Sequence, residues 1–267
     1  MRRGLFAALL GPFALLAAAA AWGCPAPAAD LTQMRESYSD PWPDGGGIIA
    51  WYDVPTTRYA HGVLGDAIEG TRLHVYSDTS RSSCGDQTLT LPEELVFEDT
   101  APRLSDLDGD GTAEIIVVQS HRDFGAQLAI YRPSADGIRL DEVATTPFIG
   151  RPNRWLAPIG AADLDGDGMM EIAYIDRPHL ARTLRVWRFE NDALTQVAAL
   201  EGLTNHRIGE PFITGGIRNC GTGPEMITAN RSWTQIMVTT LADGALHTRP
   251  LGPFSQGAVT QAMACQL

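Results

Sequence analysis

The chain has 267 residues and a formal net charge of −12, and all 20 of its basic residues are arginine. An acidic chain without a basic cluster is a poor partner for nucleic acid or anionic lipid, so the composition argues against both. Arginine without lysine, together with many Ala and Gly residues, is typical of a GC-rich bacterial coding sequence.

Residues 1–28 have the pattern of a secretory signal peptide. Two arginines precede an apolar stretch that runs to about Ala21, and residues 26–28 (Ala-Pro-Ala) offer an A-x-A cleavage site. A cut after Ala21 and an uncleaved membrane anchor are the alternatives, although the stretch is short for a spanning helix. Cys24 raises the question of a lipid anchor, but the residues before it match a lipobox poorly. We therefore expect a secreted or periplasmic protein without a membrane span.

Residues 29–45, rich in Pro, Asp, Ser and Gly, are predicted to be a flexible lead-in, and residues 46–267 are predicted to be one domain. A body of about 220 residues is long enough to bury a core of its own. We expect it to be a monomer.

Four segments with the same alternating apolar pattern recur along this body. They are residues 73–76, 128–131, 184–187 and 236–239, so the spacings are 55, 56 and 52 residues. Periods of this size, built from short strands with Gly and Asp turns, are typical of propeller blades rather than of helical repeats. The sequence therefore predicts an all-β fold, a β-propeller of about four blades. Residues 257–265 read as one further strand, which would close the ring beside the first blade or extend the fourth.

The second and third units contain the same acidic string. Residues 106–114 read D-L-D-G-D-G-T-A-E and residues 163–171 read D-L-D-G-D-G-M-M-E, and each runs into an apolar strand, at 115–118 or 172–175. Carboxylates at alternate positions suit a hard cation, and Ca²⁺ tolerates such crowded, irregular geometry better than Mg²⁺. Glycines at positions 4 and 6 let the backbone turn. Without His or Cys in either string, zinc or a redox metal is disfavoured.

We therefore predict two Ca²⁺ sites. In each loop the ligands are the three aspartates, the backbone carbonyl at position 7 and the closing glutamate, namely Asp106, Asp108, Asp110, Thr112 and Glu114 in one and Asp163, Asp165, Asp167, Met169 and Glu171 in the other. An EF-hand is excluded because position 12, Val117 or Tyr174, falls inside a strand-like run. The alternative is a solvated acidic turn that holds no ion.

The first and last repeats are predicted to keep the frame and to lose the metal. Asp53 aligns with Asp108, but Thr57 and Tyr59 stand where the second repeat has its loop glycine and glutamate. In the last repeat the three aspartate positions fall on Ile217, Asn219 and Gly221, whereas Glu225 matches the closing glutamates.

The cysteines fit an oxidising compartment. Cys220 and Cys265 occupy similar places in successive repeats, just after an apolar run, so we favour a disulfide between them. Cys84 would then be free, or would pair with Cys24 if the signal is cut early. Isolated thiols are the alternative.

The two acidic loops and the strands after them resemble the FG-GAP or VCBS repeats of integrin α-subunit propellers and of many secreted bacterial proteins. The resemblance covers residues 101–229, and the flanking quarters match in period alone. It implies a propeller that binds Ca²⁺ on one rim. That role carries over to the three aspartates and the glutamate of both loops, and not to the first and last repeats.

No catalytic signature is present: the sequence has no G-x-S-x-G elbow, no H-E-x-x-H and no phosphate-binding glycine loop. Residues 153–155 (Asn-Arg-Trp) and 205–207 (Asn-His-Arg) hold matching positions before the third and fourth inner strands, where they could line a ligand site. We favour the alternative that Trp155 packs between blades and the arginines pair with surface acids. His121 and His179 could lie on the same surface.

The leading hypothesis is a calcium-stabilised propeller that acts as a non-enzymatic binding or scaffold module for a protein or glycan partner. The first alternative is a hydrolase or lyase with its site in the propeller funnel, for which Arg154, His206 and Arg207 are the candidates. The second alternative is a structural envelope lipoprotein anchored through Cys24.

Overall fold

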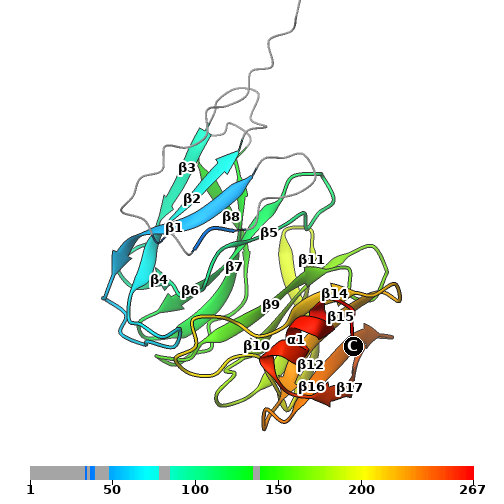
Figure 1. Cartoon of the computed structure of the whole chain (residues 1–267). Coiled ribbons are helices and arrows are strands. Elements are labelled where there is room, and N and C mark those ends of the chain that lie inside the picture. The colour runs from blue at the N-terminus through cyan, green and yellow to red at the C-terminus, as the bar shows by residue number, and fades with distance from the viewer. Residues whose placement is uncertain (1–33, 35–36, 40–47, 78–84, 135–138) are drawn as a thin grey trace, which may run out of the picture.

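A computed structural model describes residues 34, 37–39, 48–77, 85–134 and 139–267. In this part of the chain the fold is all-β, with 17 strands and one short helix (Figure 1), which confirms the predicted fold class. No helix there is both long and apolar enough to cross a membrane. The predicted signal peptide, Cys24 and Cys84 lie outside the described residues.

The first sheet has eight strands and contains the first two repeats. Their order is β1-β2-β4-β6-β7-β8, with β3 beside β2 and β5 beside β6. A single residue pair, Gly70 with Phe97, joins the repeats across β2 and β4. The bounds are β1 (Ile49–Thr56), β2 (Glu69–Ser77), β3 (Gly85–Thr90), β4 (Leu95–Phe97), β5 (Arg103–Ser105), β6 (Glu114–His121), β7 (Gly125–Pro133) and β8 (Leu140–Thr145).

The third and fourth repeats form one sheet each. In the third the strands follow one another in antiparallel order, the meander expected of a propeller blade. The fourth repeats this order, with its innermost strand divided in two. The bounds are β9 (Leu156–Ala162), β10 (Met170–Asp176), β11 (Thr183–Glu190) and β12 (Ala193–Glu201), then β13 (Leu203–Thr204), β14 (Gly216–Asn219), β15 (Pro224–Asn230), β16 (Gln235–Ala242) and β17 (Ala245–Pro253). The propeller-type repeats are thus confirmed, while a closed ring of four blades stays a prediction.

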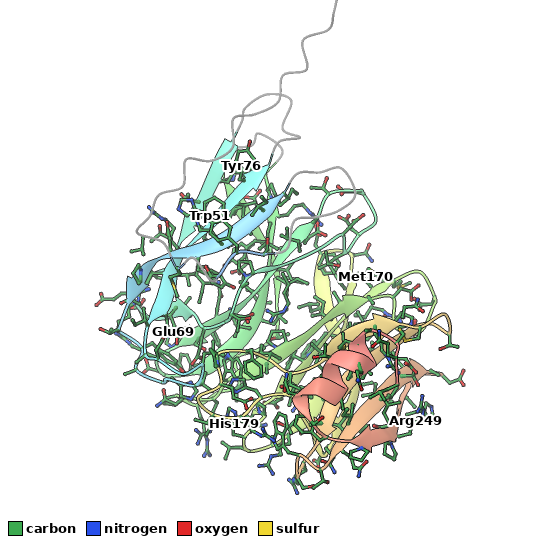
Figure 2. The ribbon with its side chains drawn as sticks, viewed as in Figure 1. Trp51, Glu69, Tyr76, Met170, His179 and Arg249 are labelled. Carbon is green, nitrogen blue, oxygen red and sulfur yellow. A yellow bond between two sulfur atoms is a disulfide. The ribbon has the colours of Figure 1, made fainter. Side chains whose placement is uncertain are left out.

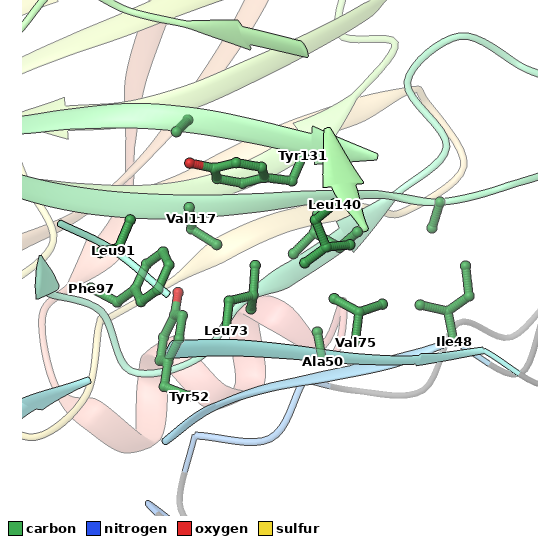
Figure 3. Packing of buried hydrophobic residues seen from close by; sticks show 13 residues of the cluster. Ile48, Ala50, Tyr52, Leu73, Val75, Leu91, Phe97, Val117, Tyr131 and Leu140 are labelled. Atoms are coloured by element: carbon green, nitrogen blue, oxygen red, sulfur yellow. The ribbon is translucent and has the colours of Figure 1, made fainter. Parts of the chain in front are cut away.

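The hydrophobic core lies between successive repeats. β6 shows the reason: Ile115 and Val117 join the cluster shared with the first repeat, whereas Ile116 and Val118 join the cluster shared with the third. Alternate residues of a strand point to opposite faces. Figure 3 shows the first of these clusters, where the rings of Tyr52 and Phe97 stack with centroids 4.9 Å apart. Each repeat therefore needs a neighbour to bury its apolar faces.

The C-terminal segment corrects one prediction. Residues 257–265 do not form a strand, because α1 (Gln256–Met263) occupies most of them. Ser255 caps this helix by accepting a hydrogen bond from the backbone N–H of Ala258, and Val259 and Ala262 are buried three residues apart. That spacing is the helical period, which a strand interpretation overlooks. The first and last repeats instead meet through loops, where the Gly209 N–H donates to the Val63 carbonyl over 2.9 Å.

The first repeat corrects another. Ile49 pairs with Tyr76 as Ile115 pairs with Tyr131, which makes Asp53 the counterpart of Gln119 within a strand. The alignment of Asp53 with Asp108 is therefore wrong. The Asp53 carboxylate pairs with Arg72 instead, and His74 Nε2 lies 2.7 Å from it. Part of the predicted lead-in also packs on β1, since Ser37 and Ser39 are buried and their hydroxyls accept from the N–H groups of Tyr52 and Ala50.

Candidate metal centres

Both acidic strings form the loop between an inner strand and the next strand, β5–β6 and β9–β10. In each loop the first aspartate organises the turn. Asp106 accepts the N–H of Gly109 at one carboxylate oxygen (2.8 Å) and the N–H of Gly111 at the other (2.9 Å). Asp163 makes the same two bonds with Gly166 and Gly168, at 2.8 and 3.0 Å. These four glycines have φ between 77° and 90°, a left-handed conformation that favours glycine.

The loops also gather carboxylates. One oxygen from each of Asp106, Asp108 and Glu114 lies within 4.8 Å of the others, and so does one from each of Asp163, Asp165 and Asp167. Each predicted site thus has three of its four carboxylates together. Asp110 and Glu171 fall outside these groups.

In both loops the closing glutamate is buried and bonds to a loop backbone N–H and to an arginine. Glu114 is fully buried; one oxygen accepts the Leu107 N–H (2.8 Å) and the other accepts the Arg132 Nε–H (2.7 Å). Glu171 repeats this with Leu164 (2.9 Å) and Arg188 (2.7 Å). Burial raises the pKa of both glutamates, and the arginines oppose that effect.

The two arginines are site residues that the motif analysis missed. Arg132 also reaches Asp108 at 2.6 Å, and Arg188 reaches Asp165 and Asp167, each at 2.8 Å. The sequence marks these two arginines as equivalent, because each directly follows the matching apolar segment, residues 128–131 or 184–187. The matching positions of the other repeats hold Ser77 and Thr240.

The residues present fit a divalent cation. Each loop holds four carboxylates, counting three aspartates and one glutamate, against one guanidinium, so it keeps a net charge of −3. The side-chain donors are all oxygen atoms, which suits Ca²⁺. The carbonyls of Thr112 and Met169 stay predicted ligands.

The fourth repeat replaces this arrangement. Arg218 pairs with Glu225 in the register of Ser105 with Glu114, which puts Asn219 at the place of Asp106. The assignment of Ile217, Asn219 and Gly221 to the three aspartate positions is therefore wrong, because the loop is shorter than the metal loops. The match of Glu225 with the closing glutamates is correct.

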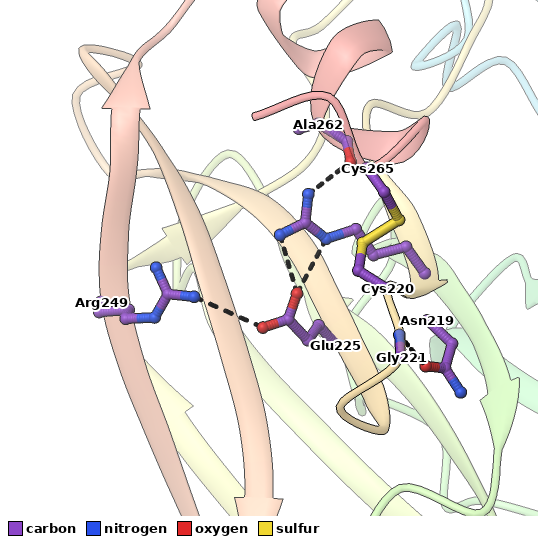
Figure 4. Close-up of a disulfide and its surroundings, with 8 residues drawn as sticks. Asn219, Cys220, Gly221, Glu225, Arg249, Ala262 and Cys265 are labelled. Atoms are coloured by element: carbon purple, nitrogen blue, oxygen red, sulfur yellow. Dashed lines mark hydrogen bonds and ion pairs between the residues drawn. A yellow bond between two sulfur atoms is a disulfide. The ribbon is translucent and has the colours of Figure 1, made fainter.

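A guanidinium and a disulfide hold the shortened loop (Figure 4). Both Nε and Nη2 of Arg218 lie within 2.9 Å of Glu225, and a further Arg218 nitrogen donates to the Ala262 carbonyl of α1. The predicted disulfide between Cys220 and Cys265 is present, with their Cα atoms 5.6 Å apart. The fourth repeat is thus fastened to the C-terminal helix.

The second candidate surface lies at the other end of the blades. Met170 and His179 mark the two ends in Figure 2. Trp155 is buried and its indole N–H donates to the Glu98 carbonyl (2.7 Å), which confirms that it packs between repeats. His179 and His206 join it, with ring centroids 6.4 and 4.9 Å from Trp155.

The three enzyme candidates have different surroundings, and Arg154 donates to the Asn153 carbonyl. His206 is fully buried, and Arg207 pairs with Glu210 and lies over the Trp233 ring at 4.2 Å. His121 packs elsewhere, against Phe124 and Phe148.

The sequence model of the FG-GAP-like repeat matches residues 106–174, a span that runs from the first acidic loop through the second. The chain contains an FG-GAP-like repeat. This confirms the predicted resemblance for that segment. No curated protein matches the chain.

Among solved structures, the chain is similar to Saccharomyces cerevisiae Sqt1, with 8% identity and a TM-score of 0.41 over 85% of this chain and 50% of that one. It is also similar to the exotype rhamnogalacturonan lyase YesX, with 15% identity and a TM-score of 0.43 over 81% of this chain and 47% of that one. The chain spans about half the length of these two proteins.

Proposed function

We propose that this protein binds one Ca²⁺ in each FG-GAP-like loop and acts, outside the cytoplasm, as a non-enzymatic binding or scaffold module. The observation that carries the proposal is the repeated loop geometry. In both loops an aspartate fixes the turn through two backbone N–H groups, and three carboxylates gather within 4.8 Å.

The electrostatics of the loops support a bound cation. One guanidinium leaves three negative charges in each loop, and these repel one another at such short separations. A divalent cation relieves this repulsion. Mg²⁺ demands near-ideal octahedral geometry at short distances, whereas Ca²⁺ accepts more ligands in a looser shell.

A location outside the cytoplasm and a binding role have support of their own. The signal-like residues 1–28 and the Cys220–Cys265 disulfide both favour an oxidising compartment. The absence of catalytic signatures in the sequence favours binding of a protein or glycan over catalysis. In this proposal the bound metals stabilise the loops of the second and third repeats. The surface that binds the partner is thereby kept rigid.

Calorimetry on chelator-stripped protein tests the calcium sites. We expect two Ca²⁺ per chain in the wild type, one in Asp108→Asn and in Asp165→Asn, and none in the double variant. Asp123→Asn is the matched control, because Asp123 is an exposed acid in the β6–β7 turn, away from both loops. Absence of binding heat in the wild type, or binding unchanged in the double variant, would contradict the proposal.

A further inference from the structure

A groove with a volume of about 510 Å³ lies at the end of the third repeat opposite the metal loops. Three parts of the chain line it: the β10–β11 turn, the neighbouring ends of β11 and β12, and the β15–β16 turn of the fourth repeat. His179 in Figure 2 marks the first of these turns. Ligand sites have volumes of roughly 300–1,000 Å³, so the groove has room for several side chains of a bound molecule.

Three arginines line the groove, and a single buried carboxylate orients two of them. Arg177 donates to both oxygens of Asp176 from Nε and Nη2, at 2.8 and 2.9 Å, and Arg185 Nε donates to one of these oxygens at 2.9 Å. Arg185 Nη1 also donates to the Gln196 side chain over 2.8 Å. Because a guanidinium has five N–H groups, both arginines keep N–H groups for a ligand.

The third arginine comes from the fourth repeat. The backbone N–H of Arg231 donates to the Gly202 carbonyl over 2.8 Å, which fixes the β15–β16 turn beside the end of β12. The Arg231 side chain is exposed and has no carboxylate partner among the described residues. Against the three arginines stand two carboxylates, Asp176 and the exposed Glu201. The groove therefore carries one positive charge in a chain whose net charge is −12.

Most of the remaining lining is aliphatic. It comes from Leu180, Ala181, Ala199 and Leu200, and no aromatic ring lines the groove. Leu180 is 58% exposed, and backbone hydrogen bonds hold its turn in place. The N–H groups of Leu180 and Arg182 both donate to the Arg177 carbonyl, over 2.8 and 3.1 Å. The groove thus presents fixed cationic donors beside an aliphatic surface.

We propose that this groove binds an acidic peptide segment of a protein partner. Carboxylates of the segment would pair with the arginines, whose planar guanidiniums suit carboxylates. Its aliphatic side chains would pack on Leu180 and Leu200. A sulfate or phosphate ion would leave this aliphatic surface uncovered, and a sugar ring would find no aromatic side chain to stack on. The inference rests on the proposed binding function and names the class of partner.

Selection from a phage-displayed library of random linear heptapeptides tests the proposal on calcium-saturated protein. We expect the retained peptides to be enriched in Asp and Glu together with Leu, Ile or Val. Calorimetry with the most enriched peptide should give an affinity roughly tenfold lower in Arg231→Gln, because an ionic hydrogen-bond donor is lost. Glu201→Gln removes a carboxylate from the groove and should raise the affinity.

Arg122→Gln is the matched control for these variants. The Arg122 side chain is 55% exposed in the β6–β7 turn, at the same end of the blades but outside the groove, so this variant should bind like the wild type. Arg231 and Glu201 are exposed as well, so neither substitution should disturb folding.

Three results would overturn the proposal: no enrichment of acidic peptides, equal binding of the selected peptide after Asn and Gln replace its Asp and Glu, or unchanged affinity in Arg231→Gln. If a galacturonate trimer binds the wild type and no acidic peptide does, the occupant is a glycan and the proposal is wrong. The calcium titration separates the two proposals. Protein that takes up two Ca²⁺ but selects no acidic peptide refutes only this inference, whereas protein that takes up no Ca²⁺ refutes the proposed function.

Discussion

Gly209 and Val63 join the last repeat to the first, because the N–H of Gly209 donates to the carbonyl of Val63 over 2.9 Å. Gly65 lies against this contact with a φ of 107°, and a Cβ at Gly65 would stand 3.0 Å from the Gly209 carbonyl oxygen. The ends of the repeat array therefore meet through a loop contact that leaves little room.

Gly65→Ala should destabilise the protein by about 1–2 kcal/mol, because alanine is strained at this φ and its methyl crowds the carbonyl of Gly209. Urea denaturation measures the change in the free energy of unfolding. Gly252→Ala is the control, since nothing lies within 4 Å of its Cβ position and its φ is not positive. Equal stability of the two variants would mean that the loop contact contributes nothing.

Arg188→Gln should destabilise the calcium-free protein by about 3 kcal/mol, because it leaves the buried Glu171 carboxylate without its partner. Added Ca²⁺ should raise the melting temperature more in this variant than in the wild type, since the cation replaces the lost positive charge. Thermal melts with and without Ca²⁺ measure both effects. Arg139→Gln, at a pair whose side chains are 64% and 50% exposed, should change stability by less than about 0.5 kcal/mol.

Glu69→Gln should stabilise the protein at pH 8 by roughly 1–3 kcal/mol. Burial, with the nearby Glu98, Asp66 and Asp99, raises the pKa of Glu69 to about 9. Since the folded pKa lies above the unfolded one, the stability present below about pH 4.5 is lost as pH rises toward 9. Urea denaturation of both proteins at pH 5 and pH 8 should show the difference mainly at pH 8. An equal difference in the free energy of unfolding between the two proteins at pH 5 and at pH 8 would contradict this account.

His179→Gln should flatten the loss of stability in mild acid. Burial, then His206, His61 and Arg182, lowers the pKa of His179 to about 4. Between pH 6.5 and 4 His179 binds a proton in the unfolded chain but stays neutral in the folded protein. The free energy of unfolding therefore falls as pH falls through this window. We expect the wild type to lose on the order of 2 kcal/mol more than the variant between pH 7 and 4. If the wild type and the variant lost equal stability between pH 7 and 4, the assignment of this loss to His179 would be wrong.

Replacing both Cys220 and Cys265 by serine should destabilise the protein by about 2–4 kcal/mol, because the disulfide closes a loop with a sequence separation of 45 residues. Calcium uptake should be unchanged, because the metal loops lie in other repeats. Denaturation and calcium titration of the double variant check the two statements separately. Loss of calcium binding would show that the fourth repeat supports the metal loops.

The features that could be read from the sequence are local ones. The strands at 115–118 and 172–175 follow from short apolar runs, and the loops follow from carboxylates and glycines within nine residues. The Cys220–Cys265 pair was predicted correctly, although Cys265 follows a helix rather than a strand of a further repeat. For the strands and the loops the deciding residues are close together in the sequence.

The missed features depend on strand register and on contacts between repeats. Arg132 meets Glu114 because β6 and β7 pair in one register, which a motif search does not fix. The loop before Glu225 is shorter than the metal loops. An alignment with equal spacing therefore places Asn219 at the second aspartate position, whereas strand register places it at the first. The contact between His179 and His206, 3.0 Å apart, forms only where the third and fourth repeats come together.

The disulfide at Cys220–Cys265 gives the two halves of the protein different vulnerabilities. In the proposed scheme, a chelator would loosen the middle of the chain and leave the C-terminal helix attached. A thiol reductant would remove the covalent link to that helix and leave the acidic loops loaded. The stability of the molecule would thus depend separately on the Ca²⁺ concentration and on the redox state of its surroundings. Limited proteolysis under each treatment would yield two distinct sets of fragments.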